Sequence, residues 1–197
     1  MAGRSINTDA GVDPYVLPPD LPRPVDDGAA DHLVGISLPA LTLPSTAGDG
    51  VALAAAGDTL VLYCYPRTGR PGERLPSGWD EFPGARGCTP QACAFRDHSR
   101  ELRQQAAAVY GISGQTLAEQ REFAARVDLH YPLLSDPGFA LAAALRLPTF
   151  ELEGSRYYSR LTLIARRGTV VKVFYPVFPP DRNAADVVAW LSAHPQS

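Results

Sequence analysis

Short apolar runs separated by turn residues predict alternating strands and helices along most of this chain. Residues 60–65 form a continuous apolar, β-branched and aromatic run that ends at Pro66, which is typical of a buried strand. Residues 91–108 are rich in Ala, Gln, Arg and Leu and predict the first main helix. Further patterns predict a strand at 108–113, a capped helix from 113–116 to 127, an apolar stretch at 133–134, a helix at 139–145 opened by Pro137, a hairpin at 158–165 and 169–175, and a closing helix at 184–193.

This order of elements predicts one domain with a short extension. The order β-α-β-α-(β)-α-β-β-α gives an α/β fold of the thioredoxin-like kind, a central mixed sheet flanked by helices. Residues 38–47 and 51–53 alternate around a Gly-Asp-Gly turn and predict an N-terminal hairpin extension. Residues 1–33 contain clustered prolines and few apolar anchors, so they are expected to form an extended arm, and residues 34–197 the domain.

Composition narrows the class of protein. The chain has 197 residues, of which 45% are hydrophobic and 20% charged, as in globular proteins. A net charge of −3 offers no electrostatic case for binding nucleic acid or an anionic membrane, and no apolar run is long enough to span a bilayer. The first 20 residues do not resemble a signal peptide. Three cysteines without an export signal favour a reducing cytoplasm.

Cys88 lies where a reactive cysteine is expected. Pro90 follows two residues later and the helix-forming segment begins at residue 91, so Cys88 falls at a helix N-terminus or in its first turn. Free backbone N–H groups and the positive end of the helix dipole favour a thiolate there, and Arg86 and Arg96 add positive charge. The alternative is a buried structural thiol.

Cys93 lies five residues further along the same expected helix. Such a spacing places the two Cα atoms about 8.6 Å apart, whereas a disulfide requires less than about 7 Å. If both cysteines are helical, a Cys88–Cys93 pair would therefore be a switch that forms a disulfide only when the first turn unwinds. The alternative for Cys93 is a small core-facing residue. His98 continues the series at the same rotation, so the three side chains cannot converge on a metal, and no metal or cofactor is expected.

Several separated blocks carry a family resemblance. Tyr65-Pro66 is followed by Gly87-Cys88-Thr-Pro-Gln-Ala-Cys93-Ala-Phe-Arg-Asp97, and related blocks lie at 110–113, 131–136 and 159–164. Over roughly residues 35–175 the chain resembles peroxiredoxins of the bacterioferritin-comigratory-protein or Q type. The resemblance implies that Cys88 attacks a peroxide and Cys93 resolves the sulfenic acid. It also implies that Arg160 stabilises the thiolate and holds the peroxide oxygens.

The chain departs from the family pattern just before Cys88. The family usually has Pro-x-x-x-Thr-x-x-Cys, whereas here the insert of residues 67–87 separates Pro66 from Cys88 and the residue three before Cys88 is Ala85. Thr68 is the candidate to supply the missing hydroxyl, and Pro66 the candidate to shield the sulfur. The insert is rich in Gly and Pro and is expected to be a loop pinned by Trp79 and Phe82, either a lid over the site or a surface ornament.

Two further residues have open alternatives. Cys64 lies within the apolar strand and is expected to be a buried core residue, since cysteine is often fully buried; the alternative is an auxiliary resolving thiol. Arg156 competes with Arg160 for the role of the active-site arginine. A strand-start arginine can also be an ordinary ion-paired surface residue, but guanidinium donors suit a developing oxyanion.

These observations predict a thiol-dependent peroxidase that reduces hydrogen peroxide and organic hydroperoxides. The expected cycle passes through a Cys88 sulfenic acid and an intramolecular Cys88–Cys93 disulfide, which thioredoxin or a similar dithiol reduces. The expected state is a monomer or weak homodimer in the cytoplasm. One alternative is a one-cysteine peroxidase with an external thiol as resolver. The other is a redox-sensing or binding module without catalytic activity, caused by loss of the motif threonine.

Overall fold

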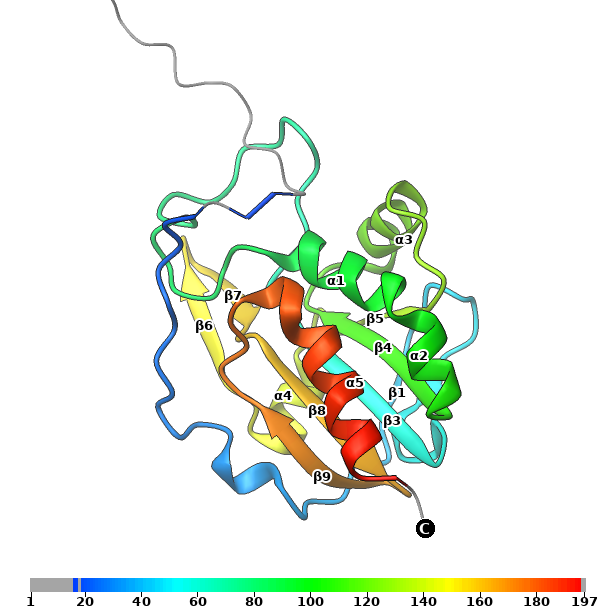
Figure 1. Ribbon diagram of the computed structural model, residues 1–197. Helices are drawn as coiled ribbons and strands as arrows, with labels where there is room; N and C mark the ends of the chain where they lie inside the picture. The colour runs from blue at the N-terminus through cyan, green and yellow to red at the C-terminus, as the bar shows by residue number, and fades with distance from the viewer. Residues whose placement is uncertain (1–15, 18, 196–197) are drawn as a thin grey trace, which may run out of the picture.

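The centre of the computed structural model, which describes residues 16–17 and 19–195, is a five-stranded mixed sheet (Figure 1). Three strands run parallel to one another. Of the two remaining strands, one pairs antiparallel with the first of these three in the sequence, and the other pairs antiparallel with that one. This is the predicted thioredoxin-like arrangement. Across the sheet, the strands are β5 (Leu133–Ser135), β4 (Ala107–Ser113), β3 (Thr59–Cys64), β8 (Leu161–Arg166) and β9 (Thr169–Phe174).

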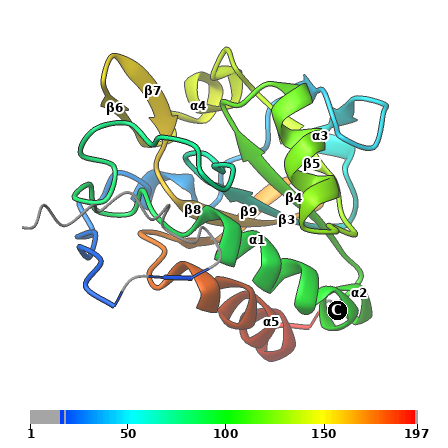
Figure 2. The same cartoon turned by 90° about the horizontal axis from the view of Figure 1, so that it is seen from above.

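Helices cover both faces of this sheet. One face carries α1 (Cys88–Asp97), α2 (Ser99–Gln104), α3 (Leu117–Arg126) and α5 (Asn183–Ala193), whose apolar side chains share one buried cluster with Val61, Tyr63 and Tyr65. Figure 2 shows α1 and α5 side by side on that face. The other face carries α4 (Ala140–Leu145). None of the described helices is long and apolar enough to cross a membrane.

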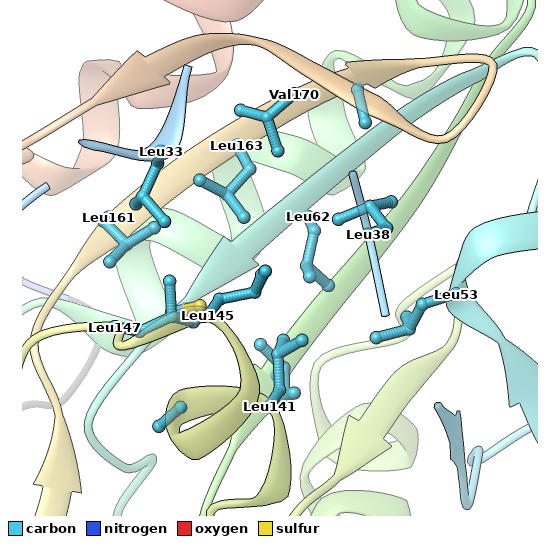
Figure 3. Close-up of a cluster of buried hydrophobic side chains, with 14 of the residues drawn as sticks. Leu33, Leu38, Leu53, Leu62, Leu141, Leu145, Leu147, Leu161, Leu163 and Val170 are labelled. Carbon is cyan, nitrogen blue, oxygen red and sulfur yellow. The ribbon is translucent and has the colours of Figure 1, made fainter. Parts of the chain in front are cut away.

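A leucine-rich cluster fills the space under the second face (Figure 3). Leu62 and Leu163 point into it from the sheet, and Leu141 and Leu145 meet them from α4. The predicted N-terminal hairpin, β1 (Thr42–Leu43) and β2 (Val51–Ala52), contributes to this cluster, as does Leu33 at the end of the arm. Each such side chain stabilises the fold by roughly 1.5–3 kcal/mol when fully buried.

The structure corrects two sequence predictions and adds one element that was not predicted. The helix predicted at 91–108 is two helices, because His98 leaves the helical region at φ −88° and ψ 10° and no Gly or Pro marks the break. Pro137 does not open α4; the Asp136 carboxylate instead accepts from the backbone N–H groups of Ala140 and Leu141, and the helix begins there. The hairpin of β6 (Thr149–Leu152) and β7 (Ser155–Tyr158) was not predicted.

Residues 67–87 contain neither helix nor strand, as predicted for the insert. Its aromatic residues hold it against the β6–β7 hairpin: the Phe82 ring stacks 4.1 Å from that of Phe150, and Trp79 meets Tyr157 edge-on at 5.1 Å. The insert therefore lies at the same end of the sheet as this hairpin. The described arm passes this end and then runs along the molecule, so that its last residues lie near the start of β9 (Figure 1).

Candidate active site

Sheet register brings the predicted site residues to one edge. In the antiparallel pair β3–β8, Cys64 lies opposite Leu161, so Arg160 comes just before β8 at the point where β3 ends. The chain leaves β3 through Tyr65 and Pro66, and the insert then returns to start α1 at Cys88. Cys88 and Arg160, 72 positions apart in the sequence, therefore meet at the end of β3.

Gly87 fixes the start of α1. Its φ of 98° lies in the left-handed region, and a Cβ at this position would be 2.3 Å from Pro180 Cγ and 2.8 Å from Leu17 Cδ2. Only glycine fits there without a shift. The chain can therefore turn sharply into the helix and place Cys88, whose exposed fraction is 4%, in the first turn under these neighbours.

Arg160 contacts the Cys88 sulfur directly. Its Nη2 lies 3.1 Å from Sγ and also donates to the carbonyl oxygens of Ala85 at 3.2 Å and Arg86 at 3.0 Å. The side chain is 3% exposed, and none of the ion pairs among the described residues includes it. Arg160 is thus a buried cation that no carboxylate among the described residues pairs with, and the Cys88 sulfur lies within its reach. Arg156 instead lies over the Phe139 ring and is exposed.

A chain of buried amides holds Arg160 in place. The Gln91 side-chain carbonyl accepts from Arg160 Nη1, and its Nε2 donates to Asn183 Oδ1 at 3.0 Å. Thr162 Oγ1 donates to the same oxygen at 2.6 Å. These three residues are at most 2% exposed. Sequence reasoning missed them, and the available signal was that Gln91 lies three residues after Cys88 and so faces the same side of α1.

One donor of Arg160 is unused. Its Nε is buried and has no hydrogen-bond partner among the described residues. The Nε–H and one Nη2–H of a guanidinium lie side by side on one edge. An oxygen that accepts from Nε–H would therefore lie next to the groups that Nη2 contacts, one of which is the Cys88 sulfur. A desolvated donor left unpaired costs about 1–3 kcal/mol, so this position suits an incoming oxygen.

Pro66 and Thr68 are both buried at this end of β3. Thr68 is bound to Gln115: its backbone N–H and hydroxyl donate to Gln115 Oε1 at 2.7 and 3.1 Å, and its carbonyl accepts from Gln115 Nε2. The hydroxyl proton is thus engaged away from the sulfur. That Thr68 replaces the motif threonine stays a prediction, as does the shielding role of Pro66.

Cys93 lies in α1 with Cys88, and all three cysteines are free thiols. Cys93 is half-buried, and burial is the main cause that raises the pKa of its thiol above the ordinary value. Helical geometry separates the two Cα atoms by about 8.6 Å, so no bond can form in this conformation. Among the described residues, no group of His, Cys, Asp or Glu side chains could hold a metal ion.

Cys64 lies on the other face of the sheet. Along β3, Leu60, Leu62 and Cys64 enter the leucine-rich cluster, while Tyr63 and Cys88 belong to the opposite one. Cys64 is fully buried, and burial first and the nearby Asp136 second raise the pKa of its thiol. The prediction of a core residue is confirmed, and the sheet separates this thiol from Cys88.

The family profile described as Redoxin matches residues 33–189, four fifths of the chain. The chain belongs to the redoxin family. Among curated relatives, chloroplastic peroxiredoxin Q of Arabidopsis thaliana is 32% identical over 81% of the chain and 67% of its own length, and that of Sedum lineare is 30% identical over 81% and 77%. This redoxin is accordingly a peroxiredoxin of the Q type, as its active-site blocks indicated.

Solved structures agree with this placement. The peroxidoxin BcpB of Mycobacterium tuberculosis superimposes with a TM-score of 0.68 at 28% identity, covering 83% of this chain and 98% of its own. Peroxiredoxin Q of Xanthomonas campestris gives 0.62 at 25% identity over 89% and 97%. The match to chloroplastic peroxiredoxin Q of Suaeda salsa spans 65% of that protein, just under two thirds of its length.

Proposed function

We propose that this peroxiredoxin is a thiol-dependent peroxidase that reduces hydrogen peroxide and organic hydroperoxides at Cys88. The observation that carries the proposal is the contact between Arg160 Nη2 and Cys88 Sγ, 3.1 Å long, buried and free of any competing carboxylate among the described ion pairs. At a helix start, a fixed cation beside a sulfur stabilises the thiolate form. It also provides a hydrogen-bond donor for the peroxide oxygen.

The first step oxidises the sulfur by two electrons. The Cys88 thiolate attacks the terminal oxygen of the hydroperoxide, an S–O bond forms, and the O–O bond breaks. The electron pair of that bond leaves with the other oxygen, which takes up a proton and departs as water or an alcohol. Arg160 Nε–H has no partner among the described residues and lies beside Nη2, so the guanidinium can stabilise the charge that develops on the leaving oxygen.

The second step requires α1 to unwind. Cys93 attacks the Cys88 sulfenic acid, a disulfide forms, and the hydroxyl leaves as water. The two cysteines are too far apart while both are helical, so the first turn must open. Tyr131 donates to the carbonyl of Ala92 at 2.9 Å and thus holds the middle of the helix, which leaves the first turn as the part that moves.

A dithiol protein such as thioredoxin would return the enzyme to its reduced form by thiol–disulfide exchange. We place the cycle in the cytoplasm, because a chain with three free thiols suits a reducing compartment. Peroxide and the reductant are the partners that this chemistry needs, and we propose a monomer or weak homodimer.

The test is intact mass after one equivalent of hydrogen peroxide, applied to the reduced wild type, Cys88→Ser and Cys93→Ser. We expect the wild type to lose two hydrogens, the Cys88→Ser protein to stay unchanged, and the Cys93→Ser protein to gain oxygen. Thioredoxin-dependent turnover measured alongside distinguishes the one-cysteine alternative, in which Cys93→Ser turns over normally. A wild type that does not react with peroxide would overturn the proposal in favour of a binding module.

A further inference from the structure

The last part of the insert, residues 80–86, leads directly into α1, and we call it the return segment. Its final two carbonyl oxygens, those of Ala85 and Arg86, accept from Arg160 Nη2 at 3.2 and 3.0 Å. The Cys88 sulfur contacts the same nitrogen at 3.1 Å and lies 3.6 Å from the Ala85 oxygen. The groups around Nη2 therefore all come from residues 85–88, so the path of the return segment fixes where the guanidinium lies relative to the sulfur.

A tight turn shapes the return segment. The backbone N–H of Ala85 donates to the carbonyl oxygen of Phe82 at 3.1 Å, with Pro83 and Gly84 between them. Gly84 has a φ of 84°, the value that the third residue of a type II turn requires, and proline suits the second position. The Phe82 ring stacks on Phe150 of the β6–β7 hairpin. The turn is therefore anchored to the hairpin where it begins and to the site where it ends.

A two-pronged ion pair closes the return segment. Nε and Nη2 of Arg86 donate to the two carboxylate oxygens of Asp80, Nη2 at 3.0 Å. The Arg86 side chain is only 10% exposed, although that of Asp80 is 55% exposed. A bidentate pair of this kind fixes the orientation of both side chains. The guanidinium of Arg86 is thus held by Asp80, while the carbonyl of the same residue is held by Arg160.

We propose that the return segment positions Arg160, and that Asp80 and Arg86 are positioning residues of the peroxidase. The inference rests on the proposed peroxidase activity, and it gives the insert a role other than a lid or a surface ornament. The ion pair holds two carbonyl oxygens where they accept from Nη2, and Gln91 accepts from Nη1 on the other side. The guanidinium is then fixed from two sides against the sulfur that attacks the peroxide.

The charges of the pair separate this role from a purely electrostatic one. A carboxylate near a thiol disfavours the thiolate, and loss of Asp80 would also release the Arg86 cation beside the site. By charge alone, removing Asp80 should therefore make Cys88 more reactive. If the pair positions Arg160, removing Asp80 should make Cys88 less reactive. The two explanations predict opposite signs for the same substitution.

The test is Asp80→Asn in the full chain, with two measurements. One is kcat/KM for hydrogen peroxide, and the other is the rate of Cys88 alkylation by iodoacetamide in a Cys93→Ser background. We expect both to fall about fivefold, which is the upper end of what ion pairs near a protein surface contribute. Asp80→Glu keeps a carboxylate that can reach Arg86, so we expect it to retain both rates within about twofold.

Glu81→Gln is the matched control. It removes the same charge from the next residue, and Glu81 is exposed and takes part in none of the ion pairs among the described residues. Both of its rates should match the wild type. Asp80 is itself largely exposed, so its substitution should leave the protein folded, and thermal unfolding of each variant checks this.

Each other outcome has a definite meaning. Rates that rise or stay unchanged in Asp80→Asn would overturn the inference, and a rise would show that Arg86 acts on Cys88 as a cation. An equal fall in Glu81→Gln would overturn it in favour of a general effect of charge on the insert. An Asp80→Glu protein as slow as Asp80→Asn would also contradict it, because the carboxylate is retained. If the wild type does not reduce hydrogen peroxide, the proposed function fails, while the alkylation rates still test the positioning of Arg160.

Discussion

Cys64 and Cys88 are both buried thiols, and the central sheet lies between them. Cys64 is fully buried among leucines, and the charged group that affects it is the Asp136 carboxylate, which acts with burial to raise the pKa of its thiol. Cys88 is 4% exposed, and the charged group that contacts it is the Arg160 guanidinium. The two sites differ little in exposure and differ in the sign of the nearest charge.

This difference shows that burial alone does not make a thiol reactive. Desolvation disfavours the charged form of a thiol in general, so the reactivity of a buried cysteine depends on what the surrounding protein supplies in return. On the Cys88 side, the protein supplies a helix start and a fixed cation. On the Cys64 side, nothing among its described neighbours does so. The alternation of β3 points Cys64 to the face opposite Tyr63, and it is the cluster around Tyr63 that contains Cys88.

Replacing Arg160 by Met should remove the positive charge that distinguishes Cys88 from Cys64. We expect this variant to lose the most peroxidase activity. Cys88 would lose its donor and its counter-charge, so we expect kcat/KM for hydrogen peroxide to fall by about 10²–10³-fold, the usual cost of losing an oxyanion donor. The rate of Cys88 alkylation by iodoacetamide at neutral pH, measured in a Cys93→Ser background, should fall as well.

Arg160→Lys serves as the comparison variant for that experiment. It keeps a charge but loses the planar fork that serves Gln91, two backbone carbonyls and the sulfur at once. We therefore expect partial activity. Arg160→Met with wild-type turnover would show that the helix start alone activates Cys88, and the charge comparison would be wrong.

Asn183→Ala should weaken the site without touching the sulfur. Asn183 Oδ1 accepts from Gln91 and Thr162, and Gln91 in turn orients Arg160, so its loss releases the arginine from one side. We expect about a tenfold loss in kcat/KM, equivalent to about 1.4 kcal/mol. Cys88 alkylation should slow in parallel, which a loss of stability alone would not produce in the folded protein.

Asp186→Ala is the control for this variant, because Asp186 lies on the same helix and is exposed. Its turnover should match the wild type. If Asn183→Ala lowers the thermal midpoint but leaves both turnover and alkylation unchanged, the amide chain only supports packing.

The position of Cys88 could be predicted from the sequence, whereas the hydrogen bonds that hold Arg160 beside it could not. Pro90 and the helix-forming run placed Cys88 at a helix start, and the structure begins α1 at that residue. The support depends on tertiary contacts that no local pattern encodes: Gln91 reads simply as a helix former, and the Ala85 carbonyl is a backbone atom of a loop. The β6–β7 hairpin was missed because Tyr157 and Tyr158 extend the apolar pattern of the following strand.

Cys64→Ala tests the unreactive side, with a smaller expected effect. Removing a fully buried sulfur leaves a small cavity, so we expect a loss of about 1 kcal/mol in the free energy of unfolding, measured by urea denaturation. Turnover and the loss of two hydrogens on oxidation should match the wild type. A variant that no longer forms the intramolecular disulfide would show that Cys64 takes part despite the sheet between the two thiols.

Cys93 is intermediate in burial between an exposed thiol and the two buried ones, and it is expected to give the smallest effect. It is half-buried, burial raises the pKa of its thiol, and Arg96 and Asp97 act on it with opposite signs. A raised pKa means that a smaller fraction of Cys93 is thiolate than in an exposed cysteine while α1 is folded, which makes it a weaker nucleophile. In a Cys64→Ser, Cys88→Ser protein, we expect the alkylation rate of Cys93 to increase with pH around a midpoint above the ordinary value of about 8.5.

Unfolding should remove that shift, because exposure restores the water that burial took away. The same variant in concentrated urea should therefore titrate near the ordinary value of about 8.5. A midpoint that is the same in the folded and the unfolded protein would mean that the fold does not restrain Cys93. If the shift is present, the conformational change that brings Cys93 to the sulfenic acid also lowers the pKa of its thiol, so the resolving thiol becomes more nucleophilic as it reaches the oxidised Cys88.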